Sequence, residues 1–250
     1  EGPTKTTMLE SEPLPPYSEG GTEPRIRVVQ ILPAVGGFGS DPGREAKFEK
    51  LLSKPFKRYR KSSAMLQLVL SGMPPRMRGK LWLHIVEAEE MRAKSPPGLY
   101  SQLLAQNCFF RDAITRDVNA LLATHPLGSS LGAGGAASLV DVLCALAVHD
   151  GELAYARPLA SLALVLLSQI GDDELGFFCL LRFLDWRFRD MLVGSQTKLK
   201  QVLHAFNELV NSRLPATAKA FASTGITDAD YLVEWATTLF ADVLEPRLLV

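Results

Sequence analysis

Several features that would identify a class of protein at once are scarce or missing in this chain of 250 residues. It has only three cysteines, Cys108, Cys144 and Cys179. An odd number of cysteines in apolar surroundings predicts reduced thiols in a cytosolic core and excludes a framework of disulfides. The 27 basic and 27 acidic side chains balance, which argues against a dedicated nucleic-acid-binding protein. The first residues, EGPTKTTMLESEPLPP, contain no apolar signal-peptide core.

Long apolar runs are missing as well. The longest strongly apolar stretch, Pro158 to Leu167, has roughly half the length that a bilayer-spanning helix needs. We interpret it as a buried core helix of a soluble, cytoplasmic protein, one that a membrane can still recruit to its surface. Because 47% of the residues are hydrophobic, a chain of this length can bury a sizeable core.

Motifs for metal binding or nucleophilic catalysis are not present in a usable form. The four histidines, His84, His125, His149 and His204, do not fall at metal-ligand spacing, so we expect structural or surface roles and no metal site. Residues 128–132 match G-x-S-x-G, but no strand precedes them, which favours a flexible loop over a nucleophile elbow. The segment GMPPRMRGK is not a phosphate loop, because Pro74 and Leu81 replace the required glycine and Ser/Thr.

Two regions of different composition divide the chain. Residues 1–43 are rich in proline and glycine and show little periodicity, which predicts a flexible N-terminal tail. One apolar segment within it, Ile26 to Val35, is a candidate to dock on the domain as an extended strip. Residues 44–250 show helical periodicity almost throughout. They predict one all-α domain of about ten helices with short connections.

The clearest helix signals lie in the second half of the chain. In TDADYLVEWATTLF, Thr227 is the expected N-cap and Asp230 the N3 partner of a capping box. Its apolar face is expected to contain Leu232, Trp235, Ala236, Leu239 and Phe240. In LKQVLHAFNELVNSRL the expected face is Val202, Phe206, Leu209 and Val210. Gly225 is placed for a left-handed C-cap. Ser138 is expected to begin the helix SLVDVLCALAV, and Asp172 or Asp173 is expected to begin the helix DELGFFCLLRFLDW.

Basic side chains concentrate between Arg44 and Lys80. This segment contains Lys54, Lys57, Arg58, Arg60, Lys61, Arg76 and Arg78 among others, with Phe56 and Tyr59 interleaved and only Glu45 and Glu49 opposing. Two interpretations stay open. The residues form a solvated face beside helices, or they attract the headgroups of an anionic membrane.

Five segments form an ordered set of motifs. SGMPPRMRGKLWLHIVEA carries Gly72, Pro74, Arg78, Gly79 and Trp82, and ITRDVNA carries Ile114 and Asp117 of an I-x-x-D-x-x-R pattern. SLVDVLCALAVHDGELAYARPL leads through Leu143, Ala145 and Tyr155 to the place of a Y-x-Q-G-M pattern. DDELGFFCLL and GITDADYLVEWATTLFA follow. Together they resemble the TBC domain of Rab GTPase-activating proteins over roughly residues 45–243.

The resemblance implies an all-helical RabGAP-TBC fold and a Rab-family small GTPase as partner. Members of that family accelerate GTP hydrolysis by lending an arginine and a glutamine in trans. The arginine offsets the charge that develops on the phosphate oxygens, and the glutamine orients water. The family domain has no cofactor of its own, since the GTPase carries GTP and Mg²⁺. Family members continue for several helices past the last matched motif, so we expect the C-terminal part of the domain to be missing from 44–250.

Both catalytic positions of the family are replaced here. The arginine position is Ala120 and the glutamine position is Arg157, which Pro158 follows. The resemblance therefore implies a domain without catalytic residues, one that binds a GTPase as an effector or scaffold in membrane trafficking. The candidate contact residues are Arg116, Asp117, Ala120, Tyr155 and Arg157.

Two alternatives remain open from the sequence. The domain is an active GTPase-activating protein that uses Arg157, or Arg116 one helical turn before Ala120, as a non-standard finger. Otherwise it is a structural interaction module that binds no GTPase. Asp117 is expected to make a helix-positioning hydrogen bond, and Tyr155 to pack as a structural aromatic residue.

Overall fold

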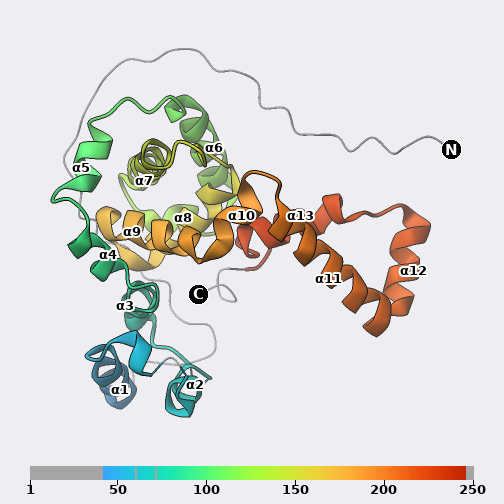
Figure 1. Cartoon of the computed structure of the whole chain (residues 1–250), viewed down its shortest axis with the longest axis horizontal. Coiled ribbons are helices and arrows are strands. Elements are labelled where there is room, and N and C mark those ends of the chain that lie inside the picture. The colour runs from blue at the N-terminus through green and yellow to red at the C-terminus, as the bar shows by residue number, and fades with distance from the viewer. Residues whose placement is uncertain (1–41, 60, 71, 246–250) are drawn as a thin grey trace.

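A computed structural model describes residues 42–59, 61–70 and 72–245, and this part of the chain is helical with no β-strand (Figure 1). The predicted all-α fold is confirmed. The expected N-terminal tail lies almost entirely outside the described residues, and its apolar segment Ile26–Val35 does so completely. No helix within the described ranges is both long enough and apolar enough to span a bilayer.

The α-helices are α1 (Pro42–Leu52), α2 (Ser63–Leu70), α3 (Pro75–Ile85), α4 (Ala88–Lys94), α5 (Leu99–Leu104), α6 (Arg111–Thr124), α7 (Gly135–His149), α8 (Pro158–Ile170), α9 (Asp173–Phe183), α10 (Arg189–Leu192), α11 (Thr197–Arg213), α12 (Pro215–Thr224) and α13 (Asp228–Thr238). Two 3₁₀ segments, η1 (Phe56–Arg58) and η2 (Gly128–Leu131), and one π-helical segment, η3 (Leu184–Phe188), complete the described part.

Helix α7 lies at the centre of the main core. It packs against α5, α6, α8 and α9, and its buried side chains point in nearly every direction, as expected for a helix that is apolar all round. It begins at Gly135, so the predicted start at Ser138 is wrong by one turn. Gly134 has a φ of 86°, and this left-handed turn lets the helix begin earlier. Ser138 is consequently a buried interior residue.

Helices α6 and α8 both pack on α7 and also contact each other. On α6, Ile114 and Val118 are buried while Ala120 is exposed, as the helical periodicity predicts. Helix α8 contains the apolar stretch from Pro158 and is buried along most of its length, so the prediction of a core helix is confirmed. Asp172 caps the next helix, because its carboxylate accepts a hydrogen bond of 2.8 Å from the N–H of Leu175.

Helix α13 begins as predicted and ends earlier than predicted. Thr227 and Asp230 form the capping box, and Gly225 adopts the left-handed conformation at the preceding C-cap. The helix ends at Thr238, where Leu239 and Phe240 turn to φ values of 50° and 64°. These two side chains are 44% and 41% exposed, so their predicted place on the buried face is wrong.

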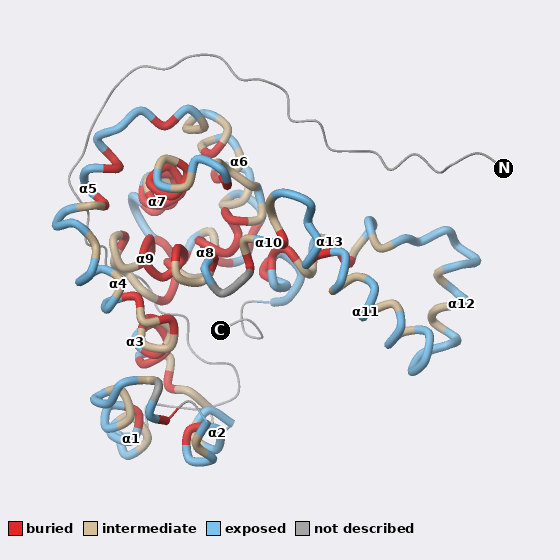
Figure 2. Tube along the Cα trace, in the orientation of Figure 1, coloured by how far each residue is buried: buried red, intermediate tan, exposed pale blue. Residues whose placement is uncertain are grey.

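A second, smaller core lies apart from the main one. Phe48, Tyr59, Met65, Met77 and Leu81 form it, and helix α3 joins the two cores because Leu83 belongs to the larger. We call α1, η1 and α2 the foot. Figure 2 shows that the foot and the α11–α12 arm are mostly exposed, whereas buried residues gather in the body between them. On α11, Leu209 is 58% exposed, so its predicted burial is wrong.

Arg189 on α10 clamps the loop that follows α7. Its Nε and Nη2 donate hydrogen bonds of 2.8 and 2.7 Å to the two carboxylate oxygens of Asp150, and Nη2 also donates to Glu152 at 3.0 Å. The bonds from Arg189 hold the pKa of Asp150 below its ordinary value. The clamp fixes the first residue of a loop that runs on to Tyr155 and Arg157.

The backbones of α3 and α8 approach so closely at Gly79 that there is no room for a side chain. A Cβ on Gly79 would collide with the carbonyl oxygen of Gln169 and lie 2.8 Å from its carbonyl carbon, and backbone atoms cannot move aside. We expect Gly79→Ala to lower the free energy of unfolding by about 2–3 kcal/mol. Urea unfolding followed by circular dichroism measures this. Gly151→Ala, where a Cβ meets no atom within 4 Å, is the matched control, and equal losses in both variants would contradict the packing argument.

The Asp150–Arg189 clamp predicts a pH-dependent contribution to stability. Because the folded pKa of Asp150 is depressed, the contribution is present above its unfolded pKa of about 3.9 and is lost as pH falls through the lower folded value. Asp150→Asn should therefore destabilise the protein by on the order of 1 kcal/mol near pH 7 and by much less in acid. Denaturant titrations across this pH range measure it. Glu152→Gln tests the 85%-exposed partner of the same arginine and should have little effect.

Candidate functional site

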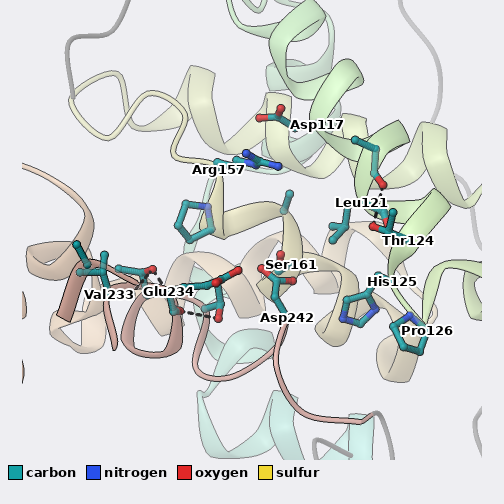
Figure 3. A pocket seen from close by; sticks show the side chains of 16 residues that line it. Asp117, Leu121, Thr124, His125, Pro126, Arg157, Ser161, Val233, Glu234 and Asp242 are labelled. Atoms are coloured by element: carbon teal, nitrogen blue, oxygen red, sulfur yellow. Dashed lines mark hydrogen bonds between the residues drawn. The ribbon is translucent and has the colours of Figure 1, made fainter. Parts of the chain in front are cut away.

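A groove of about 700 Å³ lies between α6, the start of α8, and α13 with the turn after it (Figure 3). Of the five candidate contact residues, Asp117, Ala120 and Arg157 line it, and Arg116 and Tyr155 do not. The tertiary structure thus brings together two positions that are 37 residues apart in the chain and that the resemblance assigns to the two catalytic residues.

The first contact that builds this site joins α6 to the loop before α8. The hydroxyl of Tyr155 donates a hydrogen bond of 3.0 Å to Oδ2 of Asp117. Burial, and then the negative charge of Asp117, raise the pKa of Tyr155 far above its ordinary value, so the phenol stays protonated as a donor. This agrees with the expected helix-positioning bond of Asp117 and the structural role of Tyr155.

The loop between α7 and α8 is held by its own backbone. The N–H groups of Leu153 and Ala154 donate to the side chain and the carbonyl oxygen of Asp150, at 3.0 and 2.8 Å. Ala154 has a φ of 50°, a left-handed conformation that alanine adopts only at an energetic cost. Because Arg189 holds Asp150, the loop is fixed in a strained shape that presents Tyr155 and Arg157.

Arg157 occupies the N-cap position of α8 and has helical dihedral angles, φ −49° and ψ −40°. The following Pro158 disfavours this conformation for its predecessor, although proline itself suits the first position of a helix. Pro158 has no N–H, and the N–H groups of Leu159 and Ala160 already donate to Ala156 and Arg157. The first three residues of α8 therefore offer no free N–H to a phosphate. The exposed side chain of Arg157 lies near Asp117 (Figure 3).

His125 closes one end of the groove. Its Nδ1 accepts a hydrogen bond of 3.0 Å from the N–H of Leu127, so Nε2 carries the proton and donates to the carbonyl oxygen of Ala241 at 2.9 Å. This buried histidine at the end of α6 holds the turn after α13 in place. The expectation of a structural histidine is confirmed at this position.

The charges of the groove are mostly negative. Asp117, Glu234 and Asp242 line it with one guanidinium, that of Arg157. Figure 3 shows Glu234 and Asp242 on the opposite side of the groove from Asp117. Glu234 on α13 and Asp242 after it were not among the residues predicted from the sequence. The available signal was that Glu234 lies about 200° from the buried Leu232 on a helical wheel, on the exposed face of α13.

Two further sequence candidates lie elsewhere. Arg116 is exposed, its Nε donates to the carbonyl oxygen of Asp112 at 3.4 Å, and it does not line the groove. The G-x-S-x-G segment is the 3₁₀ helix η2, so the expected flexible loop is wrong. Ser130 within it is buried and donates to the carbonyl oxygen of Leu127 at 2.7 Å, which leaves its hydroxyl inaccessible to a substrate.

Comparisons with known proteins agree with the motifs. Residues 75–250 match the family model of the Rab-GTPase-TBC domain (RabGAP-TBC), and both Ala120 and Arg157 fall within this range. The chain is 26% identical over 185 residues to the human "Ecotropic viral integration site 5 protein homolog", covering 73% of this chain and 22% of that protein. It is 27% identical over 180 residues to the Caenorhabditis elegans "Rab GTPase-activating protein eat-17", covering 71% and 20%. The chain thus spans about a fifth of the length of these curated relatives.

Solved structures show the same fold. The TBC domain of a Chlamydomonas flagellar RabGAP superposes with a TM-score of 0.64 at 19% identity, covering 87% of this chain and 77% of that one. The Ypt/Rab-GAP domain of Gyp1p superposes with a TM-score of 0.62 at 14% identity, covering 83% and 76%. The family model and the fold lead to one conclusion: the chain belongs to the RabGAP-TBC family.

Proposed function

We propose that this domain binds a Rab-type GTPase through the groove and does not accelerate GTP hydrolysis. It would act as an effector or scaffold that holds the nucleotide-bound GTPase. The observation that carries the proposal is the identity of the two residues at the catalytic positions, Ala120 and Arg157, in a groove whose supporting contacts are intact.

The charge of the transition state sets what a catalytic side chain must supply. The transition state of phosphoryl transfer spreads negative charge over the phosphate oxygens, and a positioned arginine contributes roughly a thousandfold in rate, or about 4 kcal/mol. The methyl group of Ala120 has neither charge nor reach. A glutamine that orients water is also lacking at position 157, where the side chain is a cation.

The other charges of the groove also disfavour stabilisation of a phosphate. Glu234 and Asp242 face the groove with Asp117, so a phosphate placed there meets more negative than positive charge. The start of α8 has no free N–H among its first three residues to offset that charge. Both features favour a site that contacts the protein surface of a GTPase rather than its phosphates.

One observation favours a second candidate, an active GTPase-activating protein with Arg157 as its finger. The side chain of Arg157 is exposed and lines the same groove as Ala120. A guanidinium from this loop would supply charge, while the glutamine of the GTPase orients water. Arg116 is the weaker finger under this candidate, because it does not line the groove.

Nucleotide preference and hydrolysis together separate these functions. We expect the full chain to bind at least one member of a Rab panel about tenfold more tightly with a GTP analogue than with GDP, because an effector needs differential affinity for the two states. Single-turnover hydrolysis by that Rab should be unchanged. Calorimetry and a phosphate-release assay measure both quantities.

Arg157→Ala is the discriminating variant, with Arg213→Ala on the exposed end of α11 as its control. Acceleration that Arg157→Ala abolishes would establish the second candidate. Equal affinity for the two nucleotide states across the panel, with no acceleration, would leave a module that serves another protein.

Restoring the missing side chains tests the cause of inactivity. We expect Ala120→Arg with Arg157→Gln to accelerate hydrolysis by about tenfold, well below a full finger, because Pro158 alters the backbone and an error near 1 Å costs on the order of a hundredfold. Adding Pro158→Gly should raise the rate further. Single-turnover assays compare these variants with Ala120→Arg alone. A triple variant that binds its Rab and still shows the intrinsic rate would refute the charge argument.

A further inference from the structure

The foot carries three exposed lysines on and just after α1. Lys47 and Lys50 lie about 60° apart on the helical wheel of α1, and Lys54 follows two residues after the helix ends. Glu45 and Glu49 lie on the other side of this helix, where Glu45 is half-buried. The exposed charges on one side of α1 are therefore basic, and Lys54 adds a third lysine beyond its end.

Exposed basic side chains also occur elsewhere on and beside the foot. Arg58 and Lys61 are exposed beside η1, and Arg76 and Lys80 are exposed on α3, to which the foot is packed. Among the described residues from 42 to 80, Glu49 is the only exposed acidic side chain. This local excess of basic over acidic side chains contrasts with the zero net charge of the whole chain.

Helix α2 adds an apolar surface to this basic region. Leu66, Val69 and Leu70 are 59%, 36% and 75% exposed, and their spacing places them on one face of the helix. Met65 instead turns into the small core of the foot. Three large aliphatic side chains exposed on one face of a short helix favour an interaction with a partner that takes apolar groups.

We propose that the foot docks on an anionic membrane surface, with its exposed lysines at the lipid headgroups and the exposed aliphatic side chains of α2 at the acyl boundary. Anionic lipid uses both features, because headgroups attract lysine and the acyl boundary takes exposed leucine. A nucleic acid would use the lysines and leave Leu66 and Leu70 in water. The charge complementarity therefore favours the membrane.

This surface is separate from the groove. The match to the RabGAP-TBC family begins at residue 75, after the foot. In Figure 1 the foot lies at the end of α3 that points away from α6 and α7. Docking through the foot leaves the groove free, so the inference does not rest on the proposed function.

Vesicle co-sedimentation of the full chain tests the proposal. We expect binding to vesicles of phosphatidylcholine with about a third phosphatidylserine, weak binding to phosphatidylcholine alone, and loss of binding as salt shortens the range of the charges. Replacing Lys47, Lys50 and Lys54 by glutamine should weaken binding by about fivefold per lysine, or roughly a hundredfold in total. Lys198, Lys200 and Lys219, which are exposed on α11 and α12, provide the control triple variant.

The apolar contribution is tested in parallel. Leu66→Asp with Leu70→Asp should weaken binding to the anionic vesicles by at least tenfold, because two inserted leucines are lost. Leu209→Asp with Leu214→Asp, at positions 58% and 55% exposed on the arm, is the matched control. Both pairs are exposed, so circular dichroism should show an unchanged fold.

Four outcomes would overturn the proposal. They are equal binding to neutral and anionic vesicles, no binding to either, foot variants that sediment like the parent, and control variants that lose binding equally. Light scattering that shows the leucine variant dissociating an oligomer would assign α2 to self-association instead. Lysine variants that lose affinity for an RNA probe, while vesicle binding is absent, would assign the basic face to nucleic acid.

Discussion

The hydrogen bond between Tyr155 and Asp117 is the contact on which the geometry of the groove depends. It joins α6, which carries Ala120, to the loop that carries Arg157, and it is supported from behind by the clamp of Arg189 on Asp150. These bonds link a helix, a strained loop and a distant short helix. The packing of α6 and α8 on α7 brings Ala120 and Arg157, which are 37 residues apart, to the same groove, and these bonds then hold the loop before α8 against α6.

This support does not depend on the side chains of Ala120 and Arg157, which is why the proposed function can combine GTPase binding with absence of catalysis. The contacts that shape the groove are made by Asp117, Tyr155, Asp150 and His125, and neither replaced catalytic position makes any of them. A change at Ala120 removes charge from the surface without removing packing, since Ile114 and Val118 bury the opposite face of α6. The side chains at positions 120 and 157 can therefore differ in charge without altering the contacts that shape the groove.

The two cores give the molecule two independent surfaces. The main core holds the groove, whereas the foot has its own cluster around Phe48 and Tyr59 and reaches the body through α3. Gly79 is the point where this connection is tightest, because α3 and α8 meet backbone to backbone. The proposed membrane-facing role of the foot and the proposed GTPase-facing role of the groove would then use different parts of the same chain.

The sequence by itself determined the all-α class, the caps at Thr227 and Gly225, and the exposed position of Ala120, because these follow from periodicity and local hydrogen bonding. It left Asp172 and Asp173 as alternatives for the next cap, and the structure selects Asp172. The early start of α7, the turn at Leu239 and Phe240, and the exposure of Leu209 were decided by the surrounding structure, which overrides local pattern. The meeting of Ala120 with Arg157, and the acidic side contributed by Glu234 and Asp242, were likewise decided only in three dimensions. A helical pattern tells which face is polar, but which polar faces confront one another depends on how the apolar faces pack.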